Sequence, residues 1–200
     1  DMFEGVKWLH VCGSTLSAGE AMRQACYRAC RLTVEAGGKV SFDPNLRPEL
    51  LGGAEALRQV CKPVMDTASL VLPSSTEAEL LTGRSGAGEA CRALLDGGAE
   101  VVALKRGAEG CRIITAGESV DVPAFRVNAI DPTGAGDCFD AGMVVGLLEG
   151  LPLPEAGRLA NACGALGAAK KGPMEGAEFR ADVQAFIDAE ETPKAYRDAA

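Results

Sequence analysis

Short apolar runs alternate along the chain with longer segments in which apolar residues recur every three to four positions. The short runs predict buried strands, and the longer period predicts amphipathic helices. The expected strands are Val6–Cys12, Lys39–Asp43, Ser69–Leu72, Val101–Leu104 and Cys111–Thr115, with short edge strands at Val120–Val122 and Phe125–Val127. The expected helices are Ser17–Ala36, Ala54–Met65, Ser75–Thr82, Glu89–Asp96, Ala135–Glu149, Pro154–Lys170 and Glu178–Ala189.

Regular alternation of strand and helix predicts an α/β fold with a parallel or mostly parallel sheet covered by helices on both faces. Ligands of such sheets bind beyond the carboxyl ends of the strands. The sequence contains no internal repeat and no low-complexity linker. We therefore expect residues 1–200 to belong to a single domain.

Composition narrows the classes of function. The chain has 47% hydrophobic residues and a formal net charge of −8, which argues against a basic surface for nucleic acid or anionic membranes. No apolar run approaches the roughly 18 residues that a membrane-spanning helix needs. The only histidine is His10, so mechanisms that need two histidines are excluded.

The eight cysteines predict free thiols and a reducing, cytoplasmic location. No CxxC motif is present, and most of the cysteines stand among Ala, Leu and Val, where a thiol behaves as a small buried hydrophobe. Cys26 and Cys30 are four residues apart on an expected helix and share a face, so a redox pair or a metal site is the alternative.

Candidate chemistry concentrates in Asp131–Asp137, DPTGAGD, which directly precedes an apolar helix. Gly134 and Gly136 permit a sharp turn and a close approach of a ligand, and the start of the helix offers unpaired N–H groups to an anion. The run is neither a Walker loop nor GxGxxG, because Phe139 takes the last glycine position. Asp137 would suit proton abstraction from a hydroxyl that attacks phosphorus; the alternative is an ordinary first-turn helix residue.

The segment Asp131–Val144, DPTGAGDCFDAGMV, resembles the C-terminal signature of the PfkB/ribokinase family of sugar kinases. Ser41–Arg47 resembles the DPNLR segment of 2-keto-3-deoxygluconate kinases and bacterial fructokinases. Further segments resemble the family and occur in the same order: His10–Gly13, Leu72–Gly83, which resembles the family's NxxE segment, the nucleotide-side loop Leu104–Gly110 and Asn161–Gly172. The resemblance implies a ribokinase-like three-layer α/β/α fold.

The resemblance also implies a reaction, in which ATP donates its γ-phosphoryl group to a primary hydroxyl of a small sugar or sugar acid. Asp137 would be the general base. Gly134 would shape the turn, and the amides of Ala135, Gly136 and Asp137 would stabilise charge on the transferred group.

The cofactors implied are ATP, Mg²⁺ and a monovalent cation such as K⁺. Glu77 matches the family residue that orients Mg²⁺ through water, although Ser74 replaces the Asn of that motif. The nucleotide would lie against Lys105, Gly107, Gly110, Asn161 and the glycines of the DPTGAGD run. Lys105 is equally well explained as a solvated residue, and Asn161 as a polar residue on a helix face.

Asp131 and the carbonyl of Thr133 match the family's monovalent cation site, together with residues 168–172. An Asp that opens the turn before Pro132 is the alternative explanation. A hard cation suits such oxygen ligands.

Arg47 is the candidate for recognition of the acceptor. Pro44 and Pro48 stiffen its loop, and its planar fork matches a carboxylate. The resemblance therefore favours 2-keto-3-deoxygluconate, with fructose or a nucleoside as alternatives. Pairing with Asp43, or closure of the loop, would explain Arg47 without a substrate.

The chain begins at Asp1 without an initiator Met, and relatives carry a preceding portion with a Gly-Gly sugar motif and a β-sheet lid. We expect a C-terminal part of a longer kinase that lacks the lid, is weakly active alone and forms a homo-oligomer through the lid when intact. A non-catalytic nucleotide-binding fragment is the alternative from another class. An NAD-dependent oxidoreductase is disfavoured, because the dinucleotide fingerprint is absent.

Overall fold

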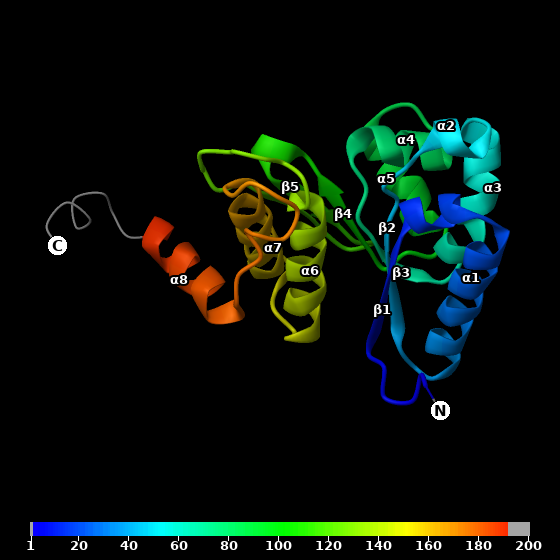
Figure 1. Ribbon diagram of the computed structural model, residues 1–200, viewed down its shortest axis with the longest axis horizontal. Helices are drawn as coiled ribbons and strands as arrows, with labels where there is room; N and C mark the ends of the chain where they lie inside the picture. The colour runs from blue at the N-terminus through cyan, green and yellow to red at the C-terminus, as the bar shows by residue number, and fades with distance from the viewer. Residues whose placement is uncertain (1, 192–200) are drawn as a thin grey trace, which may run out of the picture. The chain divides into compact units, whose positions relative to one another are not determined.

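The computed structural model describes residues 2–191 (Figure 1). Its strands form one sheet in the order β1-β2-β3-β4-β5-β6. The described residues group into two compact units, one with residues up to 106 and 112–119, the other with residues 107–111 and those from 120 on.

The first unit is built from strand–helix–strand repeats. Its elements are β1 (Trp8–Cys12), a 3₁₀ segment (Gly13–Ala18), α1 (Glu20–Glu35), β2 (Lys39–Asp43), α2 (Pro48–Leu51), α3 (Ala54–Met65), β3 (Ala68–Val71), α4 (Ser75–Thr82), α5 (Ala87–Asp96), β4 (Val101–Lys105) and most of β5 (Cys111–Ile114). The pairs β1–β2, β2–β3 and β3–β4 are all parallel, which confirms the predicted type of sheet.

The strand register brings the carboxyl ends of these strands to one edge of the sheet. Cys12 lies opposite Asp43 at the ends of β1 and β2, and an isolated parallel bridge joins Ser74 to Lys105 at the end of β4. Side chains and loops that follow these ends are therefore neighbours although they are far apart in the sequence.

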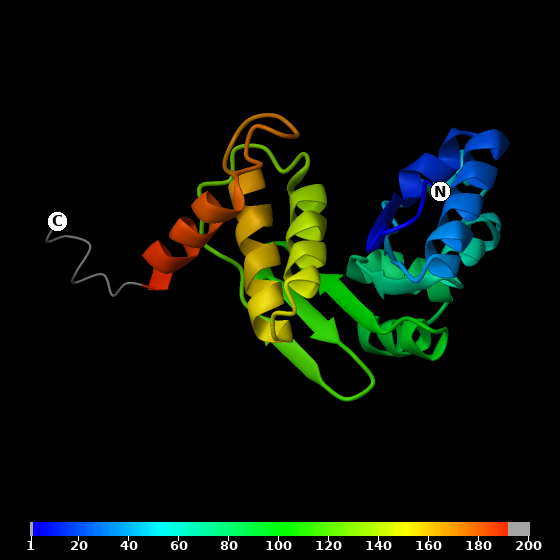
Figure 2. The ribbon, with the colours of Figure 1, turned by 90° about the horizontal axis from the view of Figure 1, so that it is seen from below.

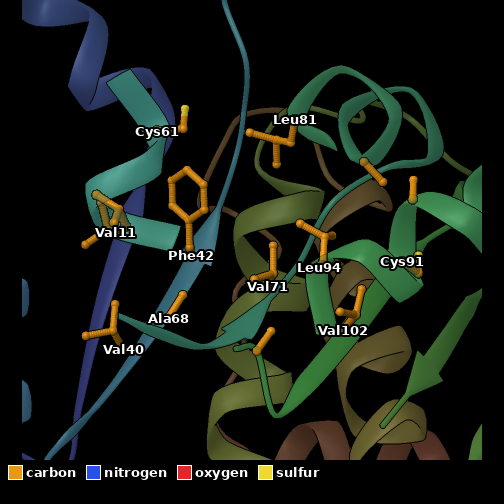
Figure 3. Packing of buried hydrophobic residues seen from close by; sticks show 14 of the residues in the cluster. Val11, Val40, Phe42, Cys61, Ala68, Val71, Leu81, Cys91, Leu94 and Val102 are labelled. Atoms are coloured by element: carbon orange, nitrogen blue, oxygen red, sulfur yellow. The ribbon is translucent and has the colours of Figure 1, made fainter. Parts of the chain in front are cut away.

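Apolar side chains from strands and helices form the core of the first unit (Figure 3). Phe42, Val71 and Val102 come from three successive strands, and they pack with Cys61 and Leu94 from α3 and α5. Phe42 and Val102 are completely shielded from solvent. Burial of one such side chain contributes about 1.5–3 kcal/mol, so this core holds the strand ends in place.

The second unit consists mainly of three helices. Its elements are a 3₁₀ turn (Gly107–Glu109), most of β6 (Ser119–Val122), α6 (Ala135–Leu148), α7 (Leu153–Ala168) and α8 (Arg180–Glu191). Figures 1 and 2 both show α6 and α7 side by side. The contact is close because it is made by small residues: a Cβ on Gly142 would lie 2.8 Å from Cα of Ala160.

A smaller apolar cluster joins α7 to α8. Leu159, Val183 and Ile187 are buried in it, and the rings of Phe125 and Phe186 lie 5.1 Å apart. None of the helices within residues 2–191 is both long enough and apolar enough to span a bilayer.

Several predicted elements differ from the structure. The run Val6–Cys12 is not a fully buried strand: β1 starts at Trp8, and Val11 is its one buried residue, since β1 pairs only with β2 among the described strands. The predicted helix Ser17–Ala36 is divided at Gly19 into a 3₁₀ segment and α1.

Two further differences are a predicted strand that does not form and a short helix that was not predicted. Phe125–Val127 is not a strand, and Phe125 packs its side chain against the α7–α8 cluster. The proline-bracketed loop after β2 contains a short helix, α2, that begins at Pro48, where the fixed φ of proline suits the first helical position.

Candidate active site

A buried ion pair lies at the carboxyl ends of β2 and β4 in the first unit. Nζ of Lys105 is 3.0 Å from Oδ1 of Asp43, and the two side chains are only 17% and 6% exposed. The same Asp43 oxygen accepts the backbone N–H of Asn45 at 3.3 Å. Lys105 is therefore held against the loop that follows β2.

Arg47 closes its own loop in this structure. Its Nη1 donates to the carbonyl oxygens of Asn45 and Leu46 at 3.3 and 2.9 Å, and the residue is exposed. The predicted alternative of a pair between Arg47 and Asp43 was wrong, since Lys105 takes that carboxylate. Sequence spacing favoured the nearer arginine, whereas the strand register brings the distant lysine to Asp43.

Glu77 connects α4 to the same loop. Oε2 accepts the N–H and the hydroxyl of Ser74, both at 2.8 Å, while Ser74 Oγ accepts the N–H of Glu77. This reciprocal capping box starts α4. Oε1 accepts the backbone N–H of Leu46 at 3.0 Å. Ser74, which replaces the Asn of the family motif, thus supplies a helix cap.

Cys12 and Asn45 also lie at the carboxyl-end edge of the sheet, although the sequence did not identify them as site residues. Nδ2 of Asn45 donates to Sγ of Cys12 at 3.3 Å, and Sγ shares a 3.1 Å hydrogen bond with the Ser14 hydroxyl. Asn45 has a φ of 37°, a conformation that Asn adopts more readily than most residues. An Asn between two loop prolines was the signal that would have identified it.

In the second unit, Asp137 lies exposed in the first turn of α6, as predicted. Gly134 caps this helix with a φ of 79°, and a Cβ there would lie 2.0 Å from the carbonyl oxygen of Pro173. The amide of Ala135 is used by the turn, because it donates to Pro132 O at 3.2 Å. The amides of Gly136 and Asp137 belong to the helix start, where N–H groups have no intrahelical acceptor and suit an anion.

The carboxylate of Asp131 joins two loops of the second unit. Oδ1 accepts the N–H of Thr133 and Oδ2 accepts the N–H of Gly172, each at 3.0 Å. Hydrogen bonds from Thr133 and Gly172 hold the pKa of Asp131 below its usual range. The structure thus brings Asp131, Thr133 and residues 168–172 together, and the carbonyl of Ala168 accepts the N–H groups of Ile130 and Asp131.

Two of the residues predicted to lie near the nucleotide converge on one carbonyl group. Gly110 has a φ of 92°, and a Cβ there would lie 2.1 Å from Val122 O. Nδ2 of the buried Asn161 donates to Val122 O and Pro123 O at 3.0 and 3.1 Å. Asn161 thereby connects α7 to the end of β6 by hydrogen bonds. Gly107 has open space around its Cβ position, which leaves its backbone approachable.

A cavity of about 430 Å³ lies beside Asp137, between α6, α7 and residues 173–178. Cys138 and Cys163 line it. Burial raises the pKa of Cys138, and it raises the pKa of Cys163 to about 11. Both thiols are therefore protonated at neutral pH, so neither is a nucleophile comparable to a catalytic cysteine.

Known proteins match most of the length of this chain. The model of the pfkB family carbohydrate kinases matches residues 1–180. The 2-dehydro-3-deoxygluconokinase of Bacillus subtilis (strain 168) is 32% identical over 96% of this chain and 60% of its own length. The fructokinase of Escherichia coli is 33% identical over 89% of this chain and 60% of its own.

A third relative acts on a nucleoside according to its name. The aminoimidazole riboside kinase of Salmonella typhimurium (strain LT2) is 33% identical over 92% of this chain and 59% of its own. Among solved structures, a putative Ribokinase II of E. coli in complex with ATP and Mg²⁺ matches with a TM-score of 0.86 and 34% identity, over 92% of this chain and 59% of that chain. The fold is ribokinase-like, and the chain spans about 60% of the length of the curated relatives it matches.

Proposed function

This chain belongs to the pfkB family of carbohydrate kinases, and from that membership we propose that its protein transfers the γ-phosphoryl group of ATP to a hydroxyl of a small carbohydrate. The observation that carries the proposal is Asp137, which stands exposed in the first turn of α6 directly after Gly134-Ala135-Gly136. The helix start attracts an anion through its N–H groups, while a carboxylate repels one. A carboxylate at this position is explained by a second task, acceptance of a proton from the attacking hydroxyl.

The residues present fit the proposed cofactors. Glu77 offers carboxylate oxygens, and Mg²⁺ in phosphoryl-transfer sites is held by few carboxylates with several waters retained. The metal, when bound with ATP, neutralises charge on the phosphates. We assign Lys105, Gly107, Gly110 and Asn161 to the nucleotide side.

For a monovalent cation such as K⁺, the loop around Asp131 offers the chemistry required. Its carboxylate is kept ionised by N–H donors, and the carbonyl of Thr133 belongs to the same loop. Oxygen ligands of this kind suit a hard cation.

We propose a sugar acid, most simply 2-keto-3-deoxygluconate, as the acceptor. Arg47 is exposed just beyond the carboxyl end of β2. Its hydrogen bonds to described residues, which go to two carbonyl oxygens, both come from Nη1. Guanidinium carries five N–H donors, so a planar carboxylate still finds two of them. Fructose is the second candidate, because the E. coli fructokinase is as similar to this chain as the 2-dehydro-3-deoxygluconokinase of B. subtilis is.

The proposal is tested by single-turnover phosphorylation with the Asp137→Asn variant of the full-length protein. General-base catalysis contributes on the order of 10²–10⁴-fold, so we expect a loss of that size with ATP binding retained. Asp182→Asn is the matched control, because Asp182 is also a first-turn carboxylate, at the start of α8. A rate for Asp137→Asn close to that of the control would contradict the assigned role.

The acceptor is tested by Arg47→Ala with 2-keto-3-deoxygluconate, fructose and ribose. Loss of a charge-assisted hydrogen bond costs about 1.5–3 kcal/mol, so we expect kcat/KM to fall at least tenfold for the acid and little for the neutral sugars. Arg58→Ala is the control, because Arg58 also donates to a carbonyl oxygen, that of Leu80. An equal loss for all three sugars would assign Arg47 to loop closure only.

A further inference from the structure

We propose that Glu77 is a positioning residue for the acceptor, because its carboxylate holds the backbone of the loop that carries Arg47. We call residues 44–47 the acceptor loop. This role is additional to the metal-orienting role assigned above, and it rests on the proposed function, since it concerns the same acceptor.

The two carboxylate oxygens of Glu77 have different partners. Oε2 is used within α4, by the N–H and hydroxyl of Ser74. Oε1 reaches out of the helix to the N–H of Leu46 at 3.0 Å, across 31 residues of sequence. A capping box needs only one of these oxygens. The bond to Leu46 therefore does more than start the helix.

Arg47 donates to the same stretch of backbone that Glu77 holds. Its Nη1 donates to the carbonyl oxygen of Leu46 at 2.9 Å and to that of Asn45 at 3.3 Å. The N–H of Leu46 lies in the same planar peptide group as the C=O of Asn45, so the bond from Glu77 to that N–H also fixes the direction of a carbonyl that Arg47 uses. Glu77 thus acts on the guanidinium through one peptide group.

The acceptor loop is also anchored at its other end. Asp43, which precedes it, is paired with Lys105 at 3.0 Å in a largely buried contact. Both anchors, Glu77 and Lys105, are residues that we assign to the metal and nucleotide side. The acceptor loop is therefore held from that side at each end, and a change at Glu77 is expected to alter acceptor binding even when metal and nucleotide are absent.

The test is calorimetric binding of 2-keto-3-deoxygluconate to the full-length protein without Mg²⁺ or ATP. Carboxylate–amide bonds are about twice as strong as neutral ones, and we expect Glu77→Gln to weaken binding about tenfold. Glu79→Gln is the matched control, because Glu79 is a neighbouring α4 carboxylate that accepts a backbone N–H, that of Gly86 at 3.1 Å, away from the acceptor loop. Unchanged affinity in Glu77→Gln would overturn the proposal.

Two further measurements separate positioning from other effects. Ser74→Ala removes the cap but leaves the Leu46 bond, so it should retain the affinity that Glu77→Gln loses; equal losses would show that only the helix start matters. Hydrogen exchange at the Leu46 amide should quicken about tenfold in Glu77→Gln and remain slow in the control.

Steady-state kinetics completes the test. We expect KM for the acid to rise about tenfold in Glu77→Gln, and the rise to vanish in an Arg47→Ala background. Amide exchange is read without any ligand, so an exchange rate unchanged by Glu77→Gln refutes the positioning contact itself. Absence of phosphorylation of any sugar by the wild-type protein refutes the proposed function instead.

Discussion

At the scale of the residue, position 134, directly before α6, is restricted to glycine for two reasons. Its φ of 79° lies in the left-handed region, and a Cβ would also lie 2.0 Å from the carbonyl oxygen of Pro173. The first constraint is conformational and the second is steric. Together they set the start of α6, and with it the position of Asp137 one turn later.

The two constraints can be measured separately. Gly150 has a φ of 71° with no atom near its Cβ position, so Gly150→Ala bears the conformational cost alone, about 1–2 kcal/mol. Gly134→Ala should destabilise the protein by about 1–3 kcal/mol more, the usual cost of overpacking. Urea denaturation of both variants checks this. Equal losses would mean that Pro173 moves aside freely.

At the scale of the element, α6 and α7 are held at short range by residues without large side chains. A Cβ on Gly142 would lie 2.8 Å from Cα of Ala160 and 2.9 Å from Sγ of Cys163, and one on Gly146 would lie 2.9 Å from Ala156. Glycine lowers helix propensity by about 1 kcal/mol relative to Ala, so these positions favour close packing over local stability.

Alanine at two helical glycines should therefore have opposite effects. Gly142→Ala pushes the two helices apart, and we expect a loss of about 1–3 kcal/mol. Gly88→Ala in α5, where the nearest atom to a new Cβ is 4.0 Å away, should be neutral or stabilising by up to about 1 kcal/mol. Thermal denaturation followed by circular dichroism distinguishes them. A stabilised Gly142→Ala variant would contradict close packing of α6 against α7.

At the scale of the whole molecule, the fold is held by packing without covalent cross-links. All eight cysteines lie within the described residues and carry thiols without a disulfide, as predicted, and Cys30, Cys61, Cys91 and Cys111 are buried. Burial raises the pKa of Cys61 to about 12. The thiolate, which is the reactive form, is therefore scarce at neutral pH.

Thiol titration with a chromogenic disulfide reagent tests this arrangement. We expect the four buried thiols to stay unlabelled in the native protein and all eight to react in denaturant, because only unfolding exposes them. A reductant should leave the melting temperature unchanged. Rapid native labelling of the buried thiols, or a melting temperature lowered by reductant, would contradict the assignment.

Local pattern was sufficient for much of this molecule. Strands such as Lys39–Asp43 and helices such as Ala54–Met65 were predicted at their observed bounds, because apolar periodicity depends on residues near in sequence. The glycine-rich start of α6 was equally visible. The division of Ser17–Ala36 and the short helix α2 were missed, because a single Gly and a proline-rich loop are weak local signals.

The sequence by itself thus determined the alternation of elements and the place of Asp137 at a helix start. Tertiary structure alone decided the long-range partners of three polar side chains: Lys105 for Asp43, the Leu46 amide for Glu77, and the Val122 and Pro123 carbonyls for Asn161. The bonds of Glu77 and Asn161 join residues 31 to 39 positions apart. Contacts at such range depend on strand register and helix packing, which one stretch of sequence does not specify.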